Sequence, residues 1–413
     1  MSEMKDSGIE WVGLCPRNWK IMANKYIMKK IKVIKPKYRG ENILSLTMNG
    51  VIIRDLEAGG KMPSSFDGYQ TLYPNNLLMC LFDYDVTPRC IGLINNDGVC
   101  SPAYSQFLLK GNNCPEYYYY YYLMIDNTKE LLHLAKNLRH SFTEEQLGNI
   151  NAPVPPIDEQ KAIANFLDEK CTDIDLLIAD IQTEIETLEE YKKSVITETV
   201  TKGLNTNVQM KDSYIEWVGK MPIHWNVMSN KYVMKKYKRI CAKYRGENIL
   251  SLTMNGVVIR DLDAGGKMPS SFDGYQYIYK GNLLMCLFDY DVTPRCIGLI
   301  DNDGITSPAY SQFVMCNGNS SRYYYYYYLM IDNTKELLHL AKNLRHSFTE
   351  DQLGAINVPV PPVEEQLQIA DYLDKKIKTI NEIIDEKSKQ IFLINEYKKS
   401  IIYEYVTGKK EVK

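Results

Sequence analysis

The chain has 413 residues, of which 45% are hydrophobic and 24% are charged, and its formal net charge is −2. This length allows about two to four domains, each with a core of its own. No apolar run reaches the roughly eighteen residues of a membrane helix, and no apolar stretch follows a basic N-terminal segment. The sequence therefore predicts a soluble, cytoplasmic protein.

The near-zero net charge hides a strong segregation of charge along the chain. The segment from Lys20 to Arg39 holds eight basic residues and no acid, whereas Asp158–Glu198 is dominated by Asp and Glu. Affinity for phosphate depends on local clusters of cations and not on the chain total. The composition therefore does not exclude nucleic acid as a partner, although a solvated basic face is an equal alternative for this stretch alone.

The chain is an internal duplication. Adding 206 to a residue number carries the first half onto the second without a gap. Residues 38–70 reappear at 244–276 with two conservative changes, and residues 117–148 reappear at 323–354 with one. A period of this length indicates a repeat of whole domains and not a solenoid.

Each copy begins with a segment of mixed character, residues 1–152 and 207–358. Leu77–Phe82 is an apolar run suited to a buried strand, and Asn95–Gly98 is a typical hairpin turn. Thr128–Leu138 has helical spacing of its apolar residues. We therefore predict two mixed α/β globular domains.

Each copy then continues into a long helix, within residues 153–206 and 359–413. The Pro-Pro pair at 155–156 sets an extended start, and Gly203 and Gly408 mark the ends. Apolar residues recur in steps of four and three for several heptads, as in a coiled coil. The chain order then requires two antiparallel spacer helices that separate two domains with pseudo-two-fold symmetry, an α+β architecture. A plain dimerisation rod is the alternative for the helices alone.

The sequence offers no catalytic or metal-binding motif, although the duplication gives each motif two chances to appear. Of the ten cysteines, only Cys80 and Cys90 recur in the second copy, which argues against a disulfide framework, and no CxxC pair is present. His133 and His140 lie seven residues apart without a carboxylate or cysteine partner nearby. We expect reduced thiols, no metal, no cofactor and no catalysis by this chain.

The repeated segments are instead rich in groups that suit DNA. Arg can bond guanine and Asn adenine through paired hydrogen bonds, while Lys and His suit phosphate. These residues gather in KYRG with SLTMNG and the following Arg, in DYDVTPR, in SPAYSQF and in LAKNLRHSF. The candidate DNA-binding residues are Lys37, Tyr38, Arg39, Asn49, Arg54, Arg89, Tyr104, Gln106, Lys136, Asn137, Arg139 and His140, with Lys243, Tyr244, Arg245, Asn255, Arg260, Arg295, Tyr310, Gln312, Lys342, Asn343, Arg345 and His346 in the second copy.

Six consecutive tyrosines occur at 117–122 and again at 323–328. They could form a surface on which bases stack, but a helix or a strand buries a large part of such a run. Packing is therefore the favoured interpretation of these tyrosines.

These features together resemble the specificity subunit of type I restriction–modification systems, over the whole chain. IEWVGLCPRNW, repeated as IEWVGKMPIHW, is similar to the segment that opens each target-recognition domain of that family. APVPPIDEQKAIANFLD and VPVPPVEEQLQIADYLD are similar to its Pro-Pro-x-x-Glu-Gln signature at the start of each conserved spacer helix. The resemblance implies a non-catalytic scaffold that reads a bipartite DNA site.

The resemblance also implies the partners. They are double-stranded DNA, two methyltransferase subunits that methylate adenine with their own S-adenosylmethionine, and translocating nuclease subunits in restriction complexes. In that family the two recognition domains usually differ, whereas here they are near copies, so we expect an interrupted palindrome as the target. Two alternatives remain: a standalone methyltransferase or nuclease, which needs a motif that is missing, and a coiled-coil scaffold with protein-binding heads, which would not require the basic stretch to recur.

Overall fold

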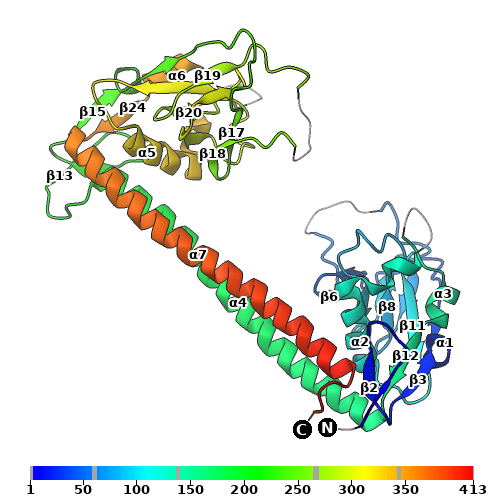
Figure 1. Ribbon diagram of the computed structural model, residues 1–413. Coiled ribbons are helices and arrows are strands. Elements are labelled where there is room, and N and C mark those ends of the chain that lie inside the picture. The colour runs from blue at the N-terminus through cyan, green and yellow to red at the C-terminus, as the bar shows by residue number, and fades with distance from the viewer. Residues whose placement is uncertain (1–2, 58–62, 136–139, 264–268, 342–345, 413) are drawn as a thin grey trace. The chain divides into compact units, whose positions relative to one another are not determined.

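The structure, a computed structural model, describes residues 3–57, 63–135, 140–263, 269–341 and 346–412. It divides into two compact units (Figure 1). Unit 1 comprises Met1–Gln182 and Lys389–Lys413, and unit 2 comprises Thr183–Ser388. Each unit thus holds one globular domain together with part of both long helices. The domain boundaries that follow from the repeat, at 152, 206 and 358, do not coincide with these units, because each helix is shared between them.

The globular domain of unit 1 is built on a four-stranded antiparallel sheet in the order β4-β11-β8-β9. Four two-stranded pairs surround it: β1 with β2, β3 with β12, β5 with β6, and β7 with β10. The elements are β1 (Met4–Asp6), β2 (Leu14–Pro16), β3 (Lys20–Ala23), α1 (Asn24–Ile27), β4 (Met28–Ile31), β5 (Leu44–Thr47), β6 (Gly50–Ile53), β7 (Gln70–Leu72), β8 (Leu77–Met79), β9 (Ile91–Leu93), β10 (Gly98–Cys100), β11 (Ser105–Leu109), α2 (Pro115–Thr128), the 3-10 helix η1 (Glu130–Leu134), α3 (Glu144–Asn149) and β12 (Asn151–Val154).

The globular domain of unit 2 repeats this arrangement, with the sheet order β16-β23-β20-β21. A short 3-10 helix takes the place of α1. The elements are β13 (Met210–Asp212), β14 (Lys220–Pro222), β15 (Asn226–Ser229), η2 (Asn230–Tyr232), β16 (Met234–Tyr237), β17 (Leu250–Thr253), β18 (Gly256–Ile259), β19 (Gln276–Ile278), β20 (Leu283–Met285), β21 (Ile297–Leu299), β22 (Gly304–Thr306), β23 (Ser311–Met315), α5 (Ser321–Thr334), η3 (Glu336–Leu340), α6 (Glu350–Ala355) and β24 (Asn357–Val360).

Helix α2 carries the six tyrosines and is the centre of the core in unit 1. Five of them are buried, and their hydroxyl groups bond to the surrounding chain. Tyr118 donates to Pro153 O at 3.2 Å and Tyr120 to Asp168 Oδ1 at 2.7 Å, while Tyr121 accepts from Trp11 Nε1 at 3.2 Å. Buried tyrosines need such partners for their polar end. The packing interpretation of this run is therefore correct.

The two long helices are α4 (Ile157–Lys202) and α7 (Val363–Val406). Each begins after a Pro-Pro pair with two acids in its first turn, where the helix dipole favours negative charge. Each is followed by a glycine with positive φ, Gly203 at 75° and Gly408 at 72°, a conformation that glycine adopts without strain. The predicted spacer helices are thus confirmed.

The helices run antiparallel within each unit. In unit 1, Lys398 Nζ lies 2.6 Å from Asp175 Oδ2, and the rings of Phe166 and Tyr405 pack 4.4 Å apart. In unit 2, Lys192 Nζ donates to Asn381 Oδ1 at 3.1 Å, and Lys387 pairs with Glu184. From one contact to the next, the residue number increases along one helix as it decreases along the other.

Each globular domain is fastened to the end of the helix that belongs to the other repeat. In unit 1, Tyr117 OH donates to Val406 O at 2.9 Å, and in unit 2, Tyr323 OH donates to Val200 O at 2.9 Å. The tryptophan of the opening segment bonds to the start of its own helix, because Trp19 Nε1 donates to Glu159 Oε2 at 2.6 Å. Two helices and one domain therefore meet at the same joint in both units.

Two local predictions are wrong. Over 128–135, the described part of the helix expected at 128–138, the end of α2 and η1 replace it, because Lys129 adopts a left-handed conformation with φ of 54° that stops the helix. Residues 136–138 of this prediction lie outside the described residues. Asn95–Gly98 is not a hairpin turn, since β9 pairs with β8 and β10 pairs with β7. The structure shows no helix, among those it describes, that is long and apolar enough to span a membrane.

We predict that Tyr117→Phe lowers the free energy of unfolding of unit 1 by about 1–3 kcal/mol, because the Val406 carbonyl loses a donor inside the core. Chemical denaturation followed by fluorescence measures this change. Tyr26→Phe is the matched control, because Tyr26 is 61% exposed. Equal midpoints for the two variants would contradict the role given to this bond.

Candidate nucleic-acid interface

A β-hairpin presents the first group of candidate residues. Strands β5 and β6 pair from Leu44↔Ile53 to Thr47↔Gly50. The turn is held by Thr47, whose Oγ1 donates to Gly50 O at 3.1 Å and accepts from Asn49 N at 3.1 Å. Asn49 is therefore exposed at a rigid tip, next to Met48, which is 58% exposed. The second copy builds the same tip, with Asn255 beside Met254.

The hairpin lies flat on the sheet because β9 has a glycine beneath it. A Cβ atom on Gly92 would lie 2.6 Å from Val51 Cγ2 and 2.7 Å from Leu46 Cδ1, so a larger residue would lift the hairpin. Gly298 has the same surroundings in unit 2. The sheet thus fixes the position of the hairpin, and the hairpin fixes the position of its tip.

The basic segment before the hairpin is also anchored. Tyr38 N donates to Asp67 Oδ1 at 2.7 Å, Tyr38 OH donates to Glu41 O at 2.9 Å, and the Tyr38 ring packs 5.2 Å from Phe66. Tyr38 is thus half-buried and acts as a support, while Lys37 and Arg39 on either side are exposed. The second copy matches this with Tyr244 between Lys243 and Arg245.

Part of the basic stretch is neutralised by ion pairs. Lys30 Nζ lies 3.4 Å from Glu144 Oε2, and Lys35 pairs with Glu41. The bonds from Lys35 and from the Arg39 backbone lower the pKa of Glu41 to about 2, which keeps this acid charged. Arg54 and Arg260 follow the hairpins and are half-buried.

The second group lies in the loop of residues 83–89, here called the strained loop, and at His140. Asp83 and His140 both have positive φ, 47° and 40°, and the same values recur within 2° at Asp289 and His346. Such backbone is costly for these residues and tends to occur at functional sites. His140 Nδ1 lies 2.8 Å from Asp85 Oδ2, so the two strained segments are tied together. Desolvation raises the pKa of Asp85, but the bond from His140 and other favourable contacts outweigh it and leave the pKa below its usual value.

Several candidate residues do not face solvent. Gln106 and Gln312 are fully buried; Gln106 Oε1 accepts from Tyr73 N at 2.7 Å, and its Nε2 donates to Thr71 O at 3.2 Å. Their predicted contact with DNA is replaced by a structural role. Arg295 Nη1 lies 3.9 Å from the buried Asp332 Oδ2, with the side chain only 18% exposed.

Arg89 and Tyr104 are half-buried. Burial raises the pKa of Tyr119 of helix α2, and the positive charge of Arg89 partly offsets this rise. The Tyr104 ring lies 6.1 Å from that of Phe82, and the Tyr310 ring repeats this contact at 6.2 Å from Phe288. Tyr104 and Tyr310 thus pack beside the residue that precedes Asp83 or Asp289. The candidates Lys136, Asn137, Arg139, Lys342, Asn343 and Arg345 lie outside the described residues.

Sequence reasoning considered polar residues alone and so missed the exposed apolar ones. Val86 in the strained loop is 73% exposed, and its counterpart Val292 is 72% exposed. Their identity in both copies was visible in the sequence, but their exposure was not. No group of three or more His, Cys, Asp or Glu among the described residues is arranged to hold a metal ion.

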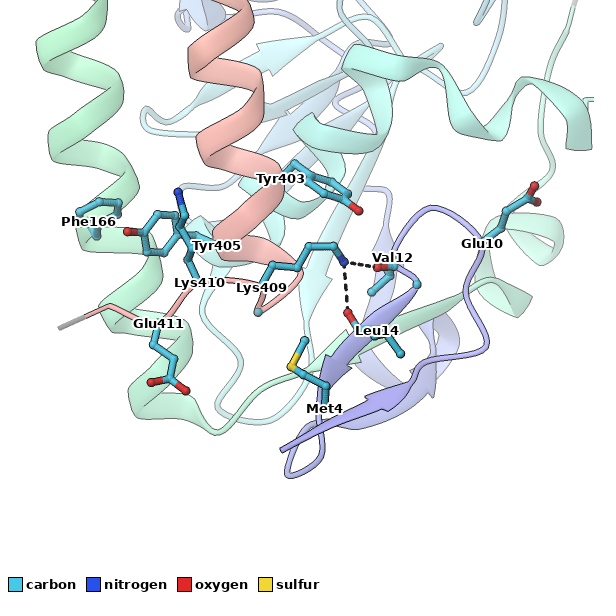
Figure 2. A pocket seen from close by; sticks show the side chains of 12 residues that line it. Met4, Glu10, Val12, Leu14, Phe166, Tyr403, Tyr405, Lys409, Lys410 and Glu411 are labelled. Carbon is cyan, nitrogen blue, oxygen red and sulfur yellow. Dashed lines mark hydrogen bonds between the residues drawn. The ribbon is translucent and has the colours of Figure 1, made fainter. Parts of the chain in front are cut away.

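A large hollow of unit 1 lies elsewhere, at the joint between the helix ends and the first strands (Figure 2). It has a volume of about 940 Å³ and is lined by Phe166, Tyr403 and Tyr405 on the helices and by Met4 and Leu14 on β1 and β2. Lys409 Nζ donates to Val12 O at 2.7 Å and to Leu14 O at 3.2 Å, which ties the end of the chain to its beginning. These contacts give the hollow a structural role at the joint.

Both mixed domains thus present exposed basic and amide side chains at the same positions, with Lys37, Arg39 and Asn49 in one copy and Lys243, Arg245 and Asn255 in the other. A family model, the type I restriction modification DNA specificity domain, matches residues 78–187 and 298–393. This chain belongs to the specificity subunits of type I restriction–modification systems.

Two curated relatives come from Methanocaldococcus jannaschii. The putative type I restriction enzyme MjaX specificity subunit is 27% identical over 286 residues, which are 66% of this chain and 62% of that protein. The type I restriction enzyme MjaVIII specificity subunit is 28% identical over 281 residues, 64% of this chain and 63% of that protein. The matched regions thus span less than two thirds of these relatives.

A solved structure shares the fold. It is a chain from work on complex assembly and conformational transition of a type I restriction–modification system, with a TM-score of 0.67 and 12% sequence identity. The match covers 95% of this chain and 98% of that chain. The predicted fold, mixed domains combined with long spacer helices, is therefore confirmed.

We predict that Gln106→Ala lowers the free energy of unfolding by about 1–3 kcal/mol, because the Tyr73 N–H loses its acceptor in the core. Asn49→Ala is the control, since this exposed residue should leave the denaturation midpoint unchanged. A Gln106→Ala protein of wild-type stability with altered DNA preference would show that Gln106 is a reader after all.

Proposed function

We propose that this chain reads a bipartite DNA sequence for a type I complex, with one globular domain on each half-site. The proposal rests on one observation above others: the exposed hairpin with Asn49, and Lys37 and Arg39 before it, recurs with the same residues and bonds in the second domain. Hydrogen-bonding side chains on a two-stranded ribbon suit base edges in the major groove, and the adjacent cations suit phosphate.

In this proposal the chain itself carries out no chemistry. It scaffolds two adenine-methyltransferase subunits, which bring S-adenosylmethionine, and translocating nuclease subunits join where the system also restricts. Family membership supports this separation of DNA reading from catalysis, because the matched domain is a DNA specificity domain. Arg139, Asn137 and His140, with their counterparts in the second copy, remain predicted readers.

The two half-sites should be inverted repeats. The domains have nearly the same sequence, so they should prefer nearly the same bases. Exchanging the two repeats also carries each joint onto the other, as Tyr117 with Val406 becomes Tyr323 with Val200. Such exchange is typical of two-fold symmetric readers, whose DNA sites are palindromic. A direct repeat would require helices that run in parallel.

Mapping the methylated adenines in a genome that carries the whole system tests this. We expect an interrupted palindrome whose two halves differ by at most one base. Purified chain alone should transfer no methyl group from S-adenosylmethionine, which separates the reader from its partner. Two unrelated half-sites or a direct repeat would overturn the inverted arrangement, and methyl transfer by the isolated chain would overturn its non-catalytic role.

A second prediction concerns affinity. The combined change of Lys37, Arg39, Lys243 and Arg245 to Ala should weaken binding to every DNA sequence and reduce the slope of log affinity against log salt by up to about 0.9 for each lost phosphate contact. Titrations at several salt concentrations measure this. Changing Lys110 to Ala is the control, because Lys110 bonds to the Lys25 carbonyl and becomes Cys316 in the other copy. An unchanged slope in the fourfold variant would exclude these cations from the interface.

A further inference from the structure

Exposed apolar side chains occupy the same positions in both globular domains. Met48 and Met254 are 58% and 59% exposed, and Val86 and Val292 are 73% and 72% exposed. Single exposed apolar residues are common on protein surfaces and need no explanation. Met48 and Val86 are instead two strongly exposed apolar residues on structured elements, and both lie in segments that the second copy preserves almost unchanged.

Not every exposed apolar residue of the first domain is kept in the second. Leu14, 54% exposed, corresponds to Lys220, and Val33, 42% exposed, corresponds to Arg239. Apolar character was lost at these two positions but kept at Met48 and Val86, as it was at Ile34, Ile53 and Leu56. Met48 and Val86 are more exposed than these three, which makes them the more accessible to a partner.

Both side chains are held by rigid backbone. Met48 precedes Asn49 in the turn that Thr47 closes with two hydrogen bonds. Val86 follows Asp83 and Asp85, which are fixed by a positive φ of 47° and by the contact with His140 at 2.8 Å. Strain of this kind persists only where surrounding structure holds it, and the second copy keeps the same strain.

The hairpin and the loop belong to one region of the domain. Hairpin residues Leu46 and Val51 pack on Gly92, which lies in the strand that directly follows the loop. In the second copy, the charge of Arg260 at the end of the hairpin acts on Tyr310, whose ring lies 6.2 Å from Phe288 at the start of the loop. Met48 and Val86 therefore project from two neighbouring elements of the same region.

The chemistry of this region matches the major groove of DNA. The groove admits a two-stranded β-ribbon, and its A·T pairs display a thymine methyl group that apolar side chains contact. Asn49 at the tip suits adenine in the same pair or the next one. Lys37 and Arg39, exposed on the segment that leads into the hairpin, suit the phosphates.

We propose that Met48 and Val86 in the first domain, and Met254 and Val292 in the second, are specificity-determining residues that contact thymine methyl groups in the major groove. This inference rests on the proposed function. It names residues that would recognise bases through apolar contact alone, without charge or hydrogen bonding. Loss of these side chains therefore changes base preference and leaves the electrostatic part of the affinity intact.

The duplication provides an internal control for the test. In Met48→Ala/Val86→Ala, one domain is changed and the other is wild type. Methylation by the complete complex is measured on a plasmid library in which each base pair of both half-sites is varied in turn. We expect about a tenfold loss of preference for A·T at one or two positions of one half-site, with unchanged preference in the other half and an unchanged salt slope on unrelated DNA.

Val33→Ala, an exposed apolar residue that the second copy does not keep, is the matched control and should leave both half-sites unchanged. The thermal midpoint of each variant shows that the domain is folded. If the folded double variant methylates every library member as the wild type does, or if its salt slope falls, the inference is wrong. If the wild-type complex itself shows no bipartite preference, the proposed function fails instead.

Discussion

The hydrogen bond between the first tyrosine of each buried helix and the end of the opposite long helix is the contact on which the architecture depends. Tyr117 bonds to Val406, and Tyr323 bonds to Val200, both at 2.9 Å. The bonding partners come from different repeats, so neither repeat completes its own unit. Antiparallel pairing of α4 with α7 follows, because each helix must end where the other begins. A glycine with positive φ then allows the chain to leave the joint, since a side chain at Gly408 would overlap Pro16 and Trp19.

The same constraint explains why the tyrosines are kept. Tyr117 and Tyr323 fill volume in the core and also bring a hydroxyl to the Val406 and Val200 carbonyls, which would otherwise lose this donor. Phenylalanine would supply the volume alone. Burial raises the pKa of Tyr117 far above the usual range, so the hydroxyl stays protonated and acts as a donor. The run is therefore a structural device and leaves recognition to other parts of the surface.

The sequence could predict the repeat, the long helices and their glycine ends, because these depend on periodicity and on local backbone preference. It could not predict the register of short strands. Asn95–Gly98 has the residues of a hairpin turn, but β10 pairs with β7 instead of β9. Gly98 serves close packing in that arrangement, because a Cβ there would overlap the Leu44 side chain and the Asn42 carbonyl. Gln106 fails as a candidate reader for a related reason: polarity alone does not show whether an amide serves the core or the surface.

The two copies have diverged in different ways in their different parts. At the end of the long helices, Tyr403 and Tyr405 of the second repeat correspond to Thr197 and Thr199 of the first, and yet the joint is built in both units. Packing at a helix end tolerates such exchange as long as the backbone bonds persist. The hairpin tip and the strained loop are identical in both copies, as is the buried tyrosine run whose first member reaches the joint. Divergence at the joint is therefore confined to side chains of the long helices, while the hydrogen bond that each globular domain makes to a helix end is the same in both units.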